Sequence, residues 1–122
     1  SNKRLYRYMV LFEFTKVKSV LGELGTTNDA KIKHYGEMAD NALMGDLINV
    51  KDLPNPPVVT IDVLTSTELS DIKSFATQYC VGYFYKFESG DEMTIAEAKE
   101  NWKNWFNSKF RRPRFKARGG EA

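Results

Sequence analysis

Hydrophobic side chains recur at every second residue in three stretches of this sequence, and no other feature limits the fold as strongly. The stretches are 5–14, 58–64 and 81–88. A two-residue period carried by aromatic and β-branched side chains is typical of β-strands. The first stretch is apolar at both parities in its middle, which predicts a strand that is covered on both faces. A short fourth strand is expected at 47–50.

Between these stretches the period lengthens to that of an amphipathic helix. One helix is expected to begin after Asn28. The patterns Thr65 to Glu68 and Thr94 to Glu97 are capping boxes that predict the start of two more helices, the second running to about Lys109. Residues 16–24 fit a helix, or the second arm of a hairpin. The helix is favoured, and the hairpin remains an alternative.

The resulting order of elements is β-α-β-β-α-β-α, which predicts an α+β fold. We expect a single domain over residues 1–110 with a ferredoxin-like (split β-α-β) antiparallel sheet and an additional C-terminal helix. Residues 111–122 are expected to form a basic C-terminal arm. The open face of the sheet needs a cover, which either the aromatic C-terminal helix or a second chain supplies, so both a monomer and a homodimer remain open.

Several classes of site are excluded by composition. The 122 residues contain one cysteine and one histidine, so an internal disulfide, a cysteine-based zinc site and a site with two imidazoles are all ruled out. No catalytic set, metal site or cofactor motif is recognised. No apolar run approaches the length of a membrane span, and no secretory signal is visible, so a cytoplasmic protein is expected.

Charge is distributed unevenly along the chain. Residues 1–108 carry 12 Lys and Arg against 15 Asp and Glu, whereas residues 109–122 carry six cations against the single acid Glu121. Arginine and lysine interleaved with phenylalanine suit phosphate contacts and base stacking. The candidate nucleic-acid-binding residues are Lys109, Arg111, Arg112, Arg114, Phe115, Lys116 and Arg118.

The aromatic residues of the last helix are candidates for a different role. Trp102, Trp105 and Phe110 are the candidate partner-binding residues, because aromatic anchors are frequent hot spots of protein interfaces. Aromatic residues at helical spacing also form helix cores, and that interpretation is favoured for Trp102 and Trp105.

We therefore expect a non-enzymatic binding or regulatory module that contacts nucleic acid, or a nucleic-acid-associated complex, through its basic C-terminal helix and arm. One alternative is a protein-protein adaptor or inhibitor, of the kind that phages encode, acting through the Trp-rich helix. A second alternative is a small dimeric α+β barrel that works as an enzyme or ligand-binding protein. Its pocket would be lined by Tyr6, Tyr8, Tyr83 and Tyr85.

Overall fold

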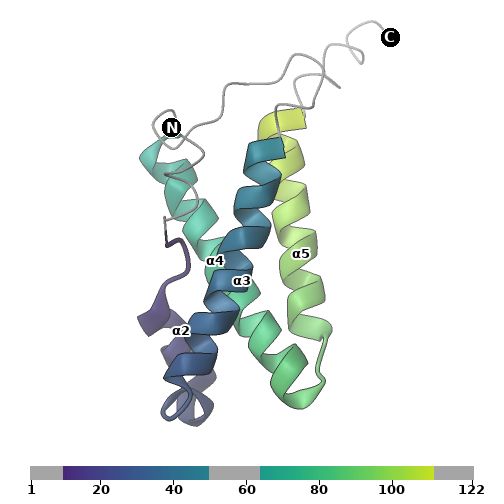
Figure 1. The fold of residues 1–122 in the computed structure, drawn as a ribbon. Coiled ribbons are helices and arrows are strands. Elements are labelled where there is room, and N and C mark those ends of the chain that lie inside the picture. The colour runs from purple at the N-terminus through teal and green to yellow at the C-terminus, as the bar shows by residue number, and fades with distance from the viewer. Residues whose placement is uncertain (1–9, 50–63, 112–122) are drawn as a thin grey trace, which may run out of the picture.

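The computed structural model describes residues 10–49 and 64–111, and every regular element within them is helical (Figure 1). Helix α4 packs against α2, α3 and α5, so it is the central element of a four-helix arrangement. The elements are α2 (Phe14–Leu21), the 3-10 turn η1 (Gly22–Gly25), α3 (Asp29–Asn49), α4 (Ser66–Ser89), α5 (Met93–Phe106) and the π-helical turn η4 (Asn107–Arg111).

The expected α+β, ferredoxin-like sheet is therefore wrong for the residues that the structure describes. The stretch 81–88 lies inside α4, and 47–49 continues α3. Residues 10–13 form no strand, and residue 64 is a bend; the remainder of the stretches 5–14 and 58–64 lies outside the described residues. The dimeric α+β barrel is wrong for the same reason, since Tyr83 and Tyr85 of its proposed pocket are helical.

The alternation at 81–88 arises because α4 is surrounded by helices. Val81 and Phe84 are both buried although they differ in parity. A helix that packs against three neighbours is apolar over most of its circumference. Its sequence therefore does not show the single narrow apolar stripe that is typical of a surface helix. The packing of these side chains outweighs the β-propensity of the aromatic residues.

The helix boundaries confirm some of the sequence signals and correct others. Residues 14–21 are helical, as favoured, and the first capping box is present: Thr65 Oγ1 accepts from the Glu68 N–H at 3.0 Å, and Glu68 Oε1 accepts from the Thr65 N–H at 2.9 Å. The second expected box is wrong. Helix α5 begins at Met93 with Glu92 at the N-cap position, two residues earlier than the box predicts, and the Met93 N–H donates to Asp91 Oδ1.

Two glycines shape the α4–α5 hairpin, one at its turn and one inside α4. Gly90 ends α4 with a φ of 75°, a left-handed conformation that glycine adopts without steric cost. Gly82 lies inside α4, where a Cβ would stand only 2.6 Å from the Ile95 Cα. The missing side chain therefore lets the backbones of α4 and α5 approach closely.

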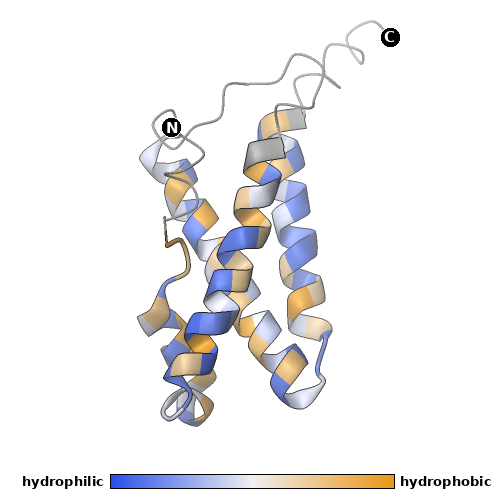
Figure 2. Cartoon of the chain, viewed as in Figure 1, coloured by the Kyte–Doolittle hydropathy of each residue, from blue (hydrophilic) through white to orange (hydrophobic). Residues whose placement is uncertain are grey.

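A single cluster of buried apolar residues fills the space between the helices. The hydropathy colouring shows hydrophobic and hydrophilic residues interspersed along every helix (Figure 2). Leu43 and Ile72 are fully buried, and so is Val17 of the short helix α2. The N-terminal part, the long helices and the hairpin thus share one core.

Candidate functional site

The C-terminal end of α5 carries a connected cluster of aromatic rings. Trp102 and Trp105 stack with their centroids 5.4 Å apart and their planes 20° from parallel. Phe75 of α4 lies 5.6 Å from each indole. Phe110 of η4 lies edge-on to Trp105 at 6.0 Å and to Phe106 at 5.0 Å. These rings attach the end of α5, and the start of the basic segment, to the helical body.

The two tryptophans of this cluster differ in exposure. Trp102 is only 2% exposed, and its Nε1–H donates to Asp46 Oδ2 of α3 at 2.7 Å. Trp105 is half-buried, and its Nε1–H donates to Asp71 Oδ2 of α4 at 3.2 Å. Trp102 is therefore a core residue that bridges α5 and α3, whereas part of Trp105 and of Phe110 faces solvent.

The candidate phosphate-binding residues lie mostly beyond the described part of the chain. Lys109 is exposed, with its Nζ 5.9 Å from the Trp105 ring centroid, and the backbone of Arg111 completes η4. The other five candidates, Arg112, Arg114, Phe115, Lys116 and Arg118, lie outside the described residues.

Two further cations were missed by the sequence interpretation. Lys99 and Lys103 are exposed on α5 one helical turn apart, ahead of Lys109. Their four-residue spacing was the available signal, because it places both on one face of a helix. Lys103 lies in the last turn of α5, where its charge complements the helix dipole, whereas Lys99 lies between the exposed acids Glu97 and Glu100.

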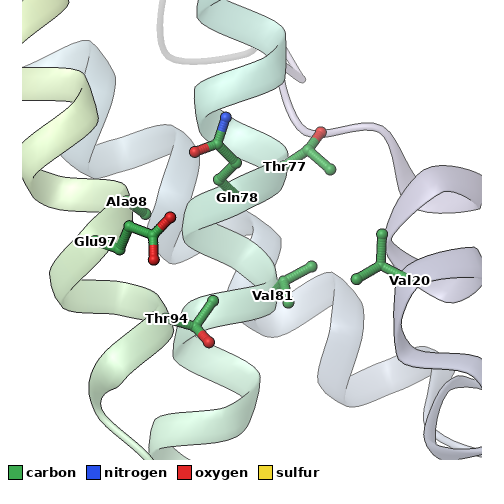
Figure 3. Close-up of a pocket in the computed structure, with 7 residues that line it drawn as sticks. All are labelled: Val20, Thr77, Gln78, Val81, Thr94, Glu97 and Ala98. Carbon is green, nitrogen blue, oxygen red and sulfur yellow. The ribbon is translucent and has the colours of Figure 1, made fainter.

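An apolar groove lies beside the N-terminal half of α5, between α5 and α2 (Figure 3). Its floor is formed by Thr77, Gln78 and Val81 of α4, and its volume is about 310 Å³. Val20 of α2, which is 61% exposed, forms one wall, and Thr94, Glu97 and Ala98 of α5 form the other. No local sequence signal predicts this groove, because three separate elements build it.

Two buried polar side chains hold the segment before α2. Asp40 of α3 accepts the backbone N–H of Leu11 at 3.1 Å and that of Phe12 at 3.0 Å. Thr77 Oγ1 of α4 accepts the N–H of Glu13 at 3.0 Å and donates to the Lys73 carbonyl. Burial raises the pKa of Asp40 to about 6, although the two N–H bonds act in the opposite direction.

Structural contacts also explain the shifted pKa values of Cys80, Tyr35 and Glu88. Cys80 is fully buried with its thiol directed at the Ile32 carbonyl, and burial raises the pKa of that thiol to about 12. Glu88 accepts from the Tyr35 hydroxyl and from Lys31 Nζ, the latter at 2.6 Å. The bond to Glu88 raises the pKa of Tyr35 to about 12, and the bonds from Lys31 and Tyr35 lower the pKa of Glu88.

The described residues contain neither a metal-ligand cluster nor a membrane-spanning helix. In the ranges 10–49 and 64–111, no group of three or more His, Cys, Asp and Glu side chains is placed to hold a metal ion. None of the helices there is long and apolar enough to cross a membrane. His34 is exposed and has the Tyr35 ring as its aromatic neighbour, with 5.4 Å between centroids.

Comparison with known proteins gives no relative: no family model, no curated protein and no solved structure matches this chain.

Proposed function

We propose that the chain is a binding module that contacts nucleic acid through the basic C-terminal part of α5 and the segment that follows it. The division of charge carries the proposal. Residues 1–108 have a net charge of −3, whereas the ten residues 109–118 contain six cations and no acid. Such a block is typical of a segment that contacts a polyanion.

The described end of α5 supports this assignment by fixing where the basic segment begins. Phe110 packs on Trp105 and Phe106, so η4 is attached to the body by aromatic contacts. Lys99, Lys103 and Lys109 are exposed on the elements that lead into it. A segment that leaves a rigid body from a fixed point loses less conformational freedom on binding than a free peptide does.

Phosphate contacts of this kind release counterions, so the affinity falls steeply with salt. They also fix the position of a protein on the nucleic acid without reading its sequence. We therefore expect binding with little sequence preference. The chemistry needs no metal ion or cofactor, because the guanidinium and ammonium groups supply the charge.

The test compares two variants of the full chain that lose the same number of charges. One replaces Arg112 and Arg114 by Gln, and the control replaces the body residues Lys16 and Lys33 by Gln. Fluorescence anisotropy is measured with labelled DNA and RNA at about 50 and 200 mM salt. If the proposal is right, the arm variant binds more weakly and its salt slope falls by about 1.4–1.8, and the control is unchanged. Equal loss in both variants, or no binding by the native chain, contradicts it.

The alternative of a protein adaptor that uses the Trp-rich helix is supported less well by the geometry. Trp102 is buried and bonded to Asp46, so a partner cannot reach it while the fold is intact. Only Trp105 and Phe110 of the three partner-binding candidates present part of their surface to solvent. These two residues adjoin the basic segment, and they therefore enter the nucleic-acid proposal.

A further inference from the structure

We propose that the bound nucleic acid is single-stranded, and that one of its unpaired bases stacks on the indole of Trp105. This inference rests on the proposed function and specifies its ligand. A base in a duplex has both of its faces covered by neighbouring pairs, so only an unpaired base can stack on a protein ring. The position, rigidity and accessibility of Trp105 carry the argument.

The Trp105 ring is held in one orientation before any ligand arrives. Its Nε1–H donates to Asp71 Oδ2 at 3.2 Å. The Trp102 indole stacks against it at 5.4 Å, and Phe75 packs at 5.6 Å. Because Trp102 is itself bonded to Asp46, the support under Trp105 spans α3, α4 and α5. A base that lands on such a ring orders no protein side chain, which lowers the cost of binding.

Part of the Trp105 side chain is also open to solvent. Trp105 is only partly buried, and Lys109 Nζ lies over it, 5.9 Å from the centroid. A cation over an exposed aromatic ring is held weakly, so a base can displace it. The released ammonium group then lies beside the base, where it can pair with a phosphate of the same strand.

The order of residues along the chain brings stacking and charge together. Lys109 follows Trp105 by one helical turn, and Arg111 completes η4 shortly after it. A strand with one base on Trp105 therefore has the ammonium group of Lys109 beside it, and five more cations follow in the sequence up to residue 118. Asp71 and Asp46 lie at the same aromatic cluster. Their negative charges repel a duplex more strongly than a single strand, because a duplex carries more phosphates per unit length.

The test uses the full chain with an oligothymidylate of about 20 nucleotides and with a duplex of the same length. The native chain is expected to bind the single strand more tightly, and its tryptophan emission to fall with the single strand only. Trp105→Phe is expected to reduce this quenching, because buried Trp102 is then the remaining reporter. This spectroscopic readout requires only a conservative change at the site.

Affinity provides the second readout. Trp105→Leu is expected to weaken single-strand binding about 5- to 100-fold and to leave duplex binding and the salt slope unchanged. The matched control is Phe87→Leu, since Phe87 is 52% exposed but lies at the other end of the α4–α5 hairpin. Circular dichroism of each variant verifies that the helices persist.

The outcomes separate the inference from the proposed function. Equal binding of both probes without quenching, or a Trp105→Leu variant with native single-strand affinity, overturns the inference but leaves nucleic-acid binding intact. Failure of the native chain to bind either probe at about 50 mM salt overturns both.

Discussion

The close approach of α4 and α5 at Gly82 predicts opposite effects for two glycine-to-alanine substitutions. Gly82 and Gly45 both lie inside long helices, where alanine is favoured over glycine by about 1 kcal/mol. A Cβ at position 45 meets no atom within 4 Å, whereas a Cβ at position 82 would lie 2.6 Å from Ile95 Cα and 2.8 Å from Ile95 N. The two positions thus share the propensity gain and differ in the steric cost.

The size of the steric cost at Gly82 follows from the atoms involved. Two carbon atoms prefer a separation of about 3.5–4.0 Å, so α5 has to move away by roughly 1 Å. The clashing atoms belong to the backbone, and Ile95, Ala98 and Trp102 of α5 are all buried, so no side-chain rotation relieves the contact. Overpacking of a core costs about 1–3 kcal/mol, and the upper part of that range applies here.

We expect Gly82→Ala to lower the free energy of unfolding by about 1–2 kcal/mol after the propensity gain is included, and Gly45→Ala to raise it by about 1 kcal/mol. Urea unfolding followed by far-UV circular dichroism measures both. With a slope of about 1–3 kcal/mol per molar urea, the Gly82→Ala midpoint falls by roughly 0.3–2 M. If Gly82→Ala is as stable as the native chain, the close helix contact is refuted.

Three further predictions concern the polar and capping groups. The folded-state pKa of Asp40, about 6, is higher than its ordinary 3.8, so its ionisation favours unfolding. The stability that protonated Asp40 contributes is therefore present at low pH and is lost as the pH rises from about 4 through 6. Asp40→Asn should remove this loss of stability between about pH 4 and 6 from the pH profile of urea unfolding. Cys80, buried with a raised pKa, should react with a thiol reagent only as fast as the protein unfolds, and rapid reaction in native buffer would contradict its burial. Thr65→Ala removes the capping box and should lower the free energy of unfolding by about 0.5–2 kcal/mol, with Thr67→Ala as the exposed control.

Local signals in the sequence correctly predicted where two of the helices begin. Asn28 and Thr65 marked the starts of α3 and α4 correctly, because a side-chain cap or break is a local event. Ser89 and Gly90 form a turn signal of the same local kind, and Gly90 has the left-handed conformation that such a turn needs. These features depend on residues within one or two turns of each other.

The sheet was mispredicted because packing decides the structure of 81–88. The expected change from helix to strand near Tyr79 had no break in the sequence to support it, since the next strong turn signal is at Ser89 and Gly90. A helical signal was present as well. Tyr79, Tyr83 and Phe87 are spaced by four residues, and their rings follow one another along α4 with centroid distances of 6.0 Å.

The candidate site was also only partly predictable from the sequence. The aromatic character of α5 was visible in the sequence, but only tertiary structure separates buried Trp102 from partly exposed Trp105. That difference depends on Asp46 and Asp71, which come from two other helices and lie 56 and 34 residues away. The apolar groove depends on three elements and had no local signal.

The attachment of residues 11–13 has a consequence for how the chain assembles. The Leu11 and Phe12 amides donate to Asp40, which lies 29 and 28 residues later in the sequence. The Glu13 amide donates to Thr77, and 64 residues separate these two. During synthesis this segment thus leaves the ribosome before either partner, and its three amide hydrogen bonds are complete only when both α3 and α4 are present. Its amides should accordingly resist exchange with deuterium in the finished protein, although they belong to no helix, and should become protected last when the unfolded chain refolds.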